Sequence, residues 1–204
     1  MTICRRVLFL LALIVAAGSF ISALPQRTPI SLGVLVDSGS RMSPMMPMAR
    51  AGFDGFVQSL AADDEVFIMT FGSTTGEIAD FTKDKASLAT KMAQIGTRGD
   101  ASLYAGLDAA SKKVQQGKNP RKVLLVLTSG NITPADFGRS KEMIEKYKLP
   151  VHFIGLSVDC GPCEANPKNL AKLAAGTFGG LTKMEGQKYT VIPAFLALLE
   201  VLNK

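Results

Sequence analysis

The sequence contains no tryptophan, one histidine and three cysteines, and aromatic residues make up only 7% of its 204 positions. It also lacks a glycine-rich phosphate loop, a zinc-ligand spacing and a hydrolase nucleophile motif, so nothing in it favours those classes of enzyme. The 19 glycines and 10 prolines are spread along the chain, which excludes collagen-like and low-complexity proteins. With 47% hydrophobic and 20% charged residues, the chain is predicted to be globular, and its length suits a single core.

Residues 1–23 have the organisation of a secretory signal peptide. Two arginines precede an uncharged apolar run at 7–17, and small residues follow it. The run is shorter than a membrane-spanning helix requires. We therefore expect an exported protein, periplasmic or extracellular, with a mature chain that begins near Leu24 and one domain over residues 28–204. The alternative is that the segment stays as a membrane anchor, and only in that case do we expect a membrane partner.

Basic residues exceed acidic ones, with 23 Lys and Arg against 17 Asp and Glu. The densest basic stretch lies at 112–122, and no aromatic residue is interleaved with it. Surfaces that bind nucleic acid commonly combine basic and aromatic residues, so this stretch is better explained as a solvated surface than as a nucleic-acid site. We expect no nucleic-acid partner.

Short apolar runs alternate with amphipathic helical patterns along the rest of the chain. Strands are predicted at 30–37, 66–71, 77–81, 122–127, 151–156 and 180–184, and helices at 48–60, 85–95, 102–116, 134–149, 169–175 and 191–202. Buried strands that alternate with helices form right-handed crossovers. The predicted fold is therefore α/β: a doubly wound, mostly parallel sheet with helices on both faces and one antiparallel edge strand, at 77–81.

In such sheets ligands bind beyond the carboxyl ends of the central strands. The residues to consider therefore follow Val36, Leu127 and Leu156. The first of these loops reads Asp-Ser-Gly-Ser-Arg from Asp37 to Arg41. An acid followed by a Ser/Gly turn at a strand end favours a binding loop.

Five segments, in this order, resemble the von Willebrand factor type A domain: LVDSGSRM, IMTFGS, GDASLYAGLDAA, KVLLVLTSG, and VHFIGLS with LAKLAAGTFGG. Together they span about residues 30 to 203, nearly the whole mature chain. Exported bacterial proteins of this type are the most similar in character. The resemblance implies the Rossmann-like fold of that family and a non-enzymatic role in binding or adhesion.

The family also implies a metal-ion-dependent adhesion site, in which Mg²⁺ or a similar ion is held by an Asp-x-Ser-x-Ser loop, a Thr and often an Asp. Here the two Ser positions counted from Asp37 are Gly39 and Arg41, whereas an alignment on Ser38 and Ser40 puts Val36 at the acid position. The Thr position is Ala101 and the Asp position of the third loop is Ser129. We therefore expect a degenerate site and no resident cofactor. Any divalent cation that does bind would use Asp37, Ser38, Ser40, Asp100 and Ser129, because hard cations take oxygen ligands.

The resemblance implies a protein or cell-surface partner that binds the loops at the carboxyl ends of the strands. The candidate partner-binding residues are Asp37, Ser38, Ser40, Arg41, Arg98, Asp100 and Ser129. With the ion lost, Arg41 and Arg98 are candidates to pair directly with a partner's carboxylate, which suits guanidinium geometry. Asp100 is also a candidate N-cap for the helix predicted at 102–116.

After removal of the signal peptide, two cysteines remain, Cys160 and Cys163, in the sequence Cys-Gly-Pro-Cys. In an oxidising compartment we expect them to form a disulfide with a structural role. The same tetrapeptide is the redox motif of thioredoxin, so the alternative function is an exported dithiol–disulfide oxidoreductase. Against it, no Trp precedes Cys160, and about 40 residues follow, too few for the remaining elements of that fold.

Four methionines, Met42, Met45, Met46 and Met48, lie close together after the first predicted strand. Thioethers can bind Cu(I). Helical spacing favours core packing instead, since methionine side chains fill irregular gaps. The single histidine, His152, lies inside a strand pattern and is interpreted as a packed residue, not a catalytic base.

Overall fold

The computed structural model describes residues 27–130, 132–156, 172–173, 181–183 and 192–203. The strands are β1 (Ile30–Asp37), β2 (Glu65–Phe71), β3 (Thr75–Thr82), β4 (Arg121–Thr128), β5 (Val151–Gly155) and β6 (Leu181–Lys183). The helices are α2 (Met46–Gln58), α3 (Lys85–Ala93), α4 (Leu103–Val114), α5 (Pro134–Tyr147) and α7 (Ile192–Leu202), with a short 3₁₀ turn, η1 (Ser40–Met42). The segment predicted as a signal peptide, both cysteines of the Cys-Gly-Pro-Cys motif and most of the helix predicted at 169–175 lie outside the described residues.

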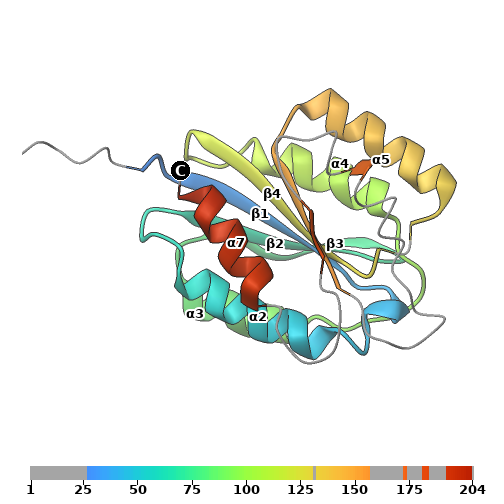
Figure 1. Cartoon of the computed structure of the whole chain (residues 1–204), viewed down its shortest axis with the longest axis horizontal. Helices are drawn as coiled ribbons and strands as arrows, with labels where there is room; N and C mark the ends of the chain where they lie inside the picture. Colours follow the sequence, from blue (N-terminus) through green and yellow to red (C-terminus); the bar gives the residue numbers. More distant parts are fainter. Residues whose placement is uncertain (1–26, 131, 157–171, 174–180, 184–191, 204) are drawn as a thin grey trace, which may run out of the picture.

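The described strands form one sheet in the order β3-β2-β1-β4-β5-β6. Neighbouring strands are parallel except for β2 and β3, which are antiparallel. The helices cover both faces of this sheet (Figure 1). The predicted fold class is therefore confirmed, including the antiparallel edge strand, which extends from Thr75 to Thr82 and not only over 77–81.

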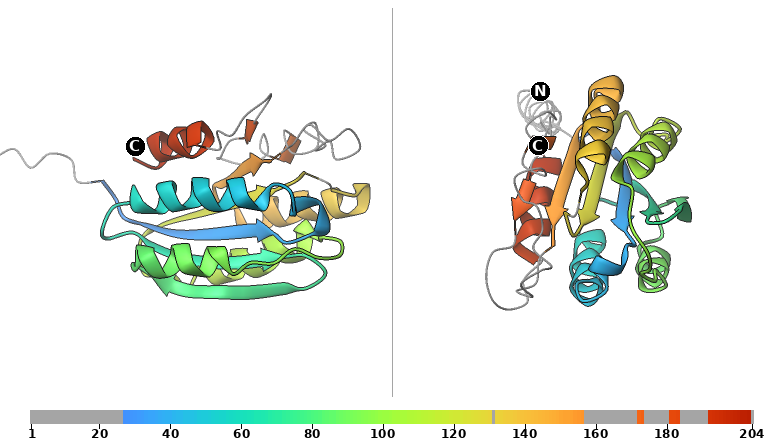
Figure 2. Two further views of the ribbon diagram at one scale, coloured as in Figure 1. Left: turned by 90° about the horizontal axis from the view of Figure 1, so that it is seen from below. Right: turned by 90° about the vertical axis from the view of Figure 1, so that its right-hand side faces the viewer.

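Strand β1 lies inside the sheet, between β2 and β4, and all eight of its residues are buried. Helices α2, α3 and α7 pack on one face through residues such as Phe53, Leu88 and Phe195. Helices α4 and α5 pack on the other face, with Leu107 and Ile144 among the buried residues. Figure 2 shows the two helical layers on either side of the strands. A strand covered on both faces reads as a continuous apolar run, which explains why β1 was recognisable in the sequence.

The methionine cluster belongs to this core. Met42, Met45 and Met46 are buried in the layer of α2, and Met48 packs against the same cluster. Helix α2 begins at Met46, two residues before the predicted start, because Pro47 is tolerated in its first turn. Core packing, the interpretation favoured from the sequence, accounts for these side chains.

The end of the sheet where β1 begins is closed by ionic and polar contacts. Arg27 Nη1 lies 2.7 Å from Asp64 Oδ1, and Arg27 Nε donates to the carbonyl oxygen of Leu202 at 3.0 Å. Burial opposes ionisation of Glu65, but hydrogen bonds from the Ser31 hydroxyl and from two backbone N–H groups outweigh this effect and lower its pKa. These contacts tie the described ends of the chain together and serve the fold.

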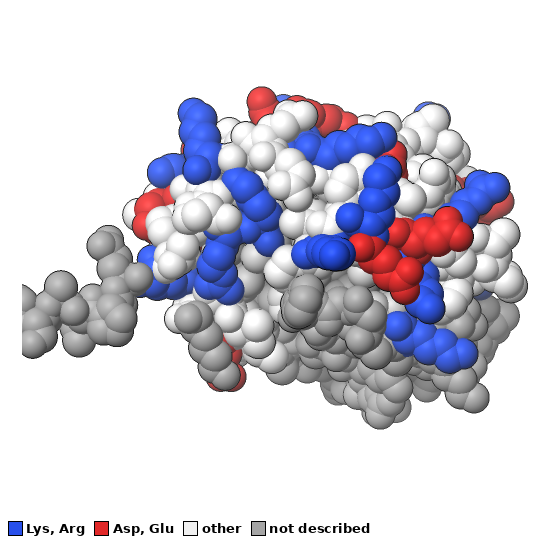
Figure 3. All heavy atoms as spheres, turned by 90° about the horizontal axis from the view of Figure 1, so that it is seen from above, with Lys and Arg blue, Asp and Glu red and all other residues white. Residues whose placement is uncertain are grey.

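The surface over α4 and α5 carries mixed charge (Figure 3). Lys112 pairs with Asp108 at 2.6 Å and Lys141 with Glu145 at 3.6 Å. Lys113 is largely buried and lies 2.9 Å from Glu77. The basic stretch at 112–122 is thus partly neutralised by neighbouring acids. Among the described residues, no helix has the length and apolar character needed to cross a bilayer.

His152 is buried in β5, with an exposed fraction of 7%. Burial lowers the pKa of its imidazole, and the nearby charge of Arg121 lowers it further. The structure therefore confirms a packed histidine.

Candidate functional site

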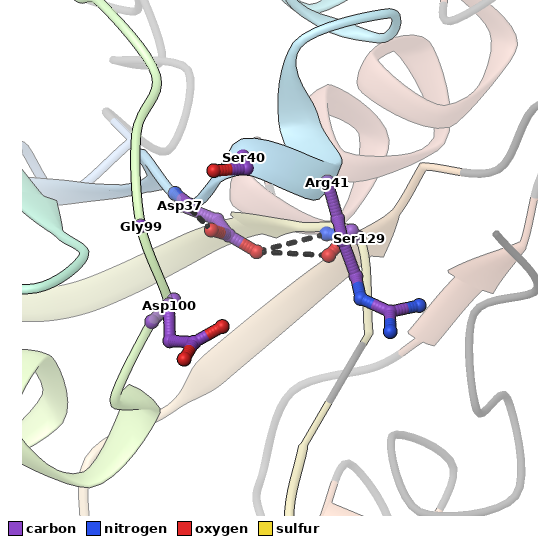
Figure 4. A pocket seen from close by; sticks show the side chains of 8 residues that line it. Asp37, Ser40, Arg41, Gly99, Asp100 and Ser129 are labelled. Atoms are coloured by element: carbon purple, nitrogen blue, oxygen red, sulfur yellow. Dashed lines mark hydrogen bonds between the residues drawn. The ribbon is translucent and has the colours of Figure 1, made fainter.

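Three loops meet at the carboxyl ends of the parallel strands. The first follows β1, the second precedes α4, and the third follows β4. They enclose a small pocket lined by Asp37, Gly39, Ser40, Arg41, Gly99, Asp100, Ala101 and Ser129 (Figure 4). Asp37, Ala101 and Ser129 therefore converge, as the sheet topology predicted from the sequence.

Asp37 is the last residue of β1, and its carboxylate is bound on both oxygens. Oδ1 accepts from the backbone N–H of Gly39 at 2.8 Å. Oδ2 accepts from the Thr128 hydroxyl at 2.9 Å and from both the backbone N–H and the hydroxyl of Ser129, at 3.2 and 3.1 Å. The residue is 3% exposed. Asp37 thus joins the first loop to the end of β4 and the third loop through three hydrogen bonds, and a fourth, from Gly39, orders the first loop itself.

The first and second loops are joined through their backbones. The N–H of Ser40 donates to the carbonyl oxygen of Gly99 at 2.8 Å, and the N–H of Arg98 donates to that of Ser38 at 2.8 Å. Gly99 has φ +66°, a left-handed conformation that glycine adopts without strain. This local conformation turns the second loop against the first.

The structure divides the residues predicted from the sequence into two groups. Asp37, Ser40, Arg41, Asp100 and Ser129 line the pocket, whereas Ser38 and Arg98 are not among its lining residues. The Ser38 hydroxyl points to β2 and donates to the carbonyl oxygen of Phe71 at 3.2 Å. Arg98 contributes its backbone to the contact between the loops and has an exposed side chain.

The pocket carries one exposed residue of each charge. Arg41 comes from the turn after β1 and Asp100 from the loop before α4, and both are exposed. In Figure 4 the carboxylate of Asp37 points toward Ser129, whereas the charged ends of Arg41 and Asp100 project away from it on different sides. The site therefore has a buried, hydrogen-bonded centre and exposed charges at its edge.

Two further residues, Thr128 and Asp136, hold the loops and were not predicted from the sequence. Thr128 donates to Asp37 and accepts from the backbone N–H of Gly130 at 3.0 Å. Asp136, in the first turn of α5, accepts from the Ser102 hydroxyl at 2.8 Å and from two backbone N–H groups of α4. The expectation that Asp100 caps α4 is wrong, because Ser102 is the N-cap residue. Neither missed contact follows from sequence spacing, since each joins separate elements.

Comparisons with solved structures agree with this architecture. The chain is similar to a von Willebrand factor type A protein from Catenulispora acidiphila (14% identity, TM-score 0.71, covering 84% of this chain and 42% of that one). It is also similar to the PilB minor pilin of Streptococcus sanguinis (12% identity, TM-score 0.73, covering 88% and 63%). A third similar structure is the vWF domain of the type V pili tip protein Mfa5 of Porphyromonas gingivalis (11% identity, TM-score 0.68, covering 87% and 96%).

At these identities the structural matches establish the fold alone. The chain spans less than half the length of the Catenulispora protein and about two thirds of the pilin. A search of curated proteins found no match. The family model described as the von Willebrand factor type A domain matches residues 30–181, more than half of the sequence. The chain therefore belongs to the von Willebrand factor type A domain family.

Proposed function

We propose that this chain is an exported, non-enzymatic binding module that recognises a protein or surface partner through the rim, by which we mean residues 37–41, 98–101 and 129. The observation that carries the proposal is the state of Asp37, whose carboxylate is occupied by four donors of the chain itself. These internal hydrogen bonds fix the conformation of the rim, and its exposed charged side chains are available to a partner. Two of the similar structures are pilus proteins, which supports a protein or a surface as the binding partner.

We further propose that recognition is independent of a metal ion. A hard cation requires several oxygen ligands with free lone pairs. Asp37 already accepts four hydrogen bonds from the chain, three of them on Oδ2, and the two Ser positions of the family's loop, counted from Asp37, are Gly39 and Arg41. The residues present therefore do not fit the family's ion, and hydrogen bonds supply the link between loops.

Arg41 and Arg98 are the residues proposed to contact a carboxylate of the partner. Both side chains are exposed, and a guanidinium binds a carboxylate through two parallel hydrogen bonds. Arg41 lines the pocket, so its loss should have the larger effect. Asp100, also exposed at the pocket, suits a basic group of the partner. Because the loops are already ordered, binding need not spend free energy on fixing them.

The alternative function, dithiol–disulfide exchange at Cys160 and Cys163, depends on residues outside the described part of the chain. The fold established above is that of the von Willebrand factor type A family, whereas the redox motif suggested a thioredoxin-like fold. No observation on the described residues favours a redox activity. We therefore keep binding as the proposed function and a structural disulfide as the proposed role of the cysteines.

Site-specific photo-crosslinking in the cells that make the protein tests this function. A photoreactive residue is placed at Ser40 or at Asp100, both exposed on the rim, and at Glu142 on the exposed surface of α5 as the control. We expect the two rim positions to capture the same partner and Glu142 not to capture it. The yield should be unchanged by a chelator, and Arg41→Ala should lower the yield at Ser40 about tenfold, the effect of losing a charge-assisted hydrogen bond.

Two results would contradict the proposal. Capture at Glu142 as strong as at the rim would place the binding surface elsewhere. Loss of capture at Ser40 when divalent cations are removed would show that recognition requires an ion.

A further inference from the structure

Asp136 reaches from one helix to the start of another. It lies in the first turn of α5, and its own N–H donates to the N-cap hydroxyl of Thr133 at 3.1 Å. The carboxylate of Asp136, in contrast, accepts hydrogen bonds from the start of α4. Oδ2 accepts from the N–H of Leu103 at 2.7 Å, and Oδ1 accepts from the N–H of Tyr104 at 3.2 Å and from the Ser102 hydroxyl at 2.8 Å.

This arrangement gives α4 a cap from outside its own segment. The first N–H groups of a helix have no partner within it and are usually bound by the N-cap side chain. Ser102 performs that task weakly, since its hydroxyl oxygen lies 3.5 Å from the N–H of Ala105. Asp136 binds the two preceding N–H groups, and a carboxylate is favoured at a helix N-terminus by the helix dipole. The position of the α4 start therefore depends on α5.

The contact also completes a ring around the pocket. Asp37 joins the first loop to the third, and the backbone bonds of Ser40 and Arg98 join the first loop to the second. Asp136 joins the end of the second loop, at Ser102, to α5, which follows the third loop. Each loop is thus bound on two sides. A ring of this kind holds its members more firmly than separate contacts do, because displacing one loop strains the bonds of the others.

We propose that Asp136 is a positioning residue of the rim, which holds the second loop against the first and so fixes the width of the pocket. The proposal rests on the proposed function only in taking the rim as the binding surface. Asp136 is not a lining residue of the pocket and acts through Ser102 and the start of α4. Its effect should therefore extend to loop contacts that it does not itself touch.

Residue-resolved amide hydrogen exchange of the full chain tests this inference. The variants are Asp136→Ala and Asp136→Asn, with Glu142→Gln, an exposed acid of the same helix, as the matched control. In Asp136→Ala we expect exchange at Leu103 and Tyr104 to rise about tenfold, the usual effect of a lost cap. Exchange at Ser40 and Arg98, whose N–H groups join the first two loops, should rise as well, whereas Glu142→Gln should leave all four unchanged.

Asp136→Asn keeps one acceptor oxygen and should give a smaller rise at the same four amides, so it provides the result if the alanine variant does not fold. A rise confined to Leu103 and Tyr104 would overturn the proposal and leave Asp136 as a local cap. An unchanged pattern would overturn it as well. This readout needs no partner, so it separates failure of the inference from failure of the proposed function, which is decided by photo-crosslinking from position 40 in a chain that keeps Asp136.

Discussion

Replacing Asp37 with alanine is expected to lower the free energy of unfolding by about 3 to 5 kcal/mol. The carboxylate is buried and accepts four hydrogen bonds. Its removal leaves the N–H groups of Gly39 and Ser129 and two hydroxyl groups without their acceptor in a buried site, and each buried unsatisfied donor is costly. Urea denaturation at neutral pH, followed by circular dichroism, measures the change.

Asp100→Ala is the matched control, because Asp100 lines the same pocket and is exposed. We expect it to change the free energy of unfolding by no more than about 0.5 kcal/mol. Asp37→Asn retains one acceptor oxygen, so its loss in the free energy of unfolding should lie between those of Asp37→Ala and Asp100→Ala. It provides the comparison if Asp37→Ala does not fold. A loss below about 1 kcal/mol for Asp37→Ala would mean that the carboxylate does not hold the loops together.

Gly106→Ala is expected to destabilise the protein by about 1 to 3 kcal/mol, although alanine is the better helix former. Gly106 lies in α4 where the helix meets the sheet. A Cβ there would come within 2.6 Å of Phe71 Cβ and 3.2 Å of Leu35 Cδ1. Phe71 and Leu35 are both fully packed, so α4 must move outward to relieve the overlap. Thermal and urea denaturation give the measurement.

Gly138→Ala in α5 is the control for this prediction, since a Cβ at Gly138 meets no atom within 4 Å. At Gly138 only the higher helix propensity of alanine matters, and we expect the free energy of unfolding to rise by about 0.5 to 1 kcal/mol. The two substitutions are chemically identical and should have opposite signs. A gain in stability from Gly106→Ala would contradict the close packing of α4 on β1 and β2.

Much of the fold could be predicted because the central strands leave a simple pattern. All eight residues of β1 are buried, so its sequence is a mostly apolar run, with Ser31 as the exception, ended by Asp37. Every residue of β3 is half-buried or exposed and none is fully buried, as in an edge strand. Strand order and crossover handedness then bring the ends of β1 and β4 together, and Asp37 and Ser129 could be assigned to one site from topology alone.

Side-chain direction in the loops could not be predicted in the same way. Ser38 and Ser40 are equivalent in the sequence, yet the hydroxyl of Ser38 is bound to the carbonyl of Phe71 and only Ser40 lines the pocket. Asp136 reads as an ordinary first-turn acid of its own helix, and its contact with α4 depends on the tertiary packing of two helices. Such contacts have no period or spacing by which sequence reasoning could find them.

The central claim is that hydrogen bonds to Asp37, and not a divalent cation, hold the loops of the rim. Isothermal titration of Mg²⁺ and of Mn²⁺ into the protein measures this most directly, with Asp37→Asn titrated in parallel. We predict no saturable binding tighter than about 1 mM for either ion, and no difference between the two proteins. A single site with a Kd in the micromolar range that is lost in Asp37→Asn would contradict the account.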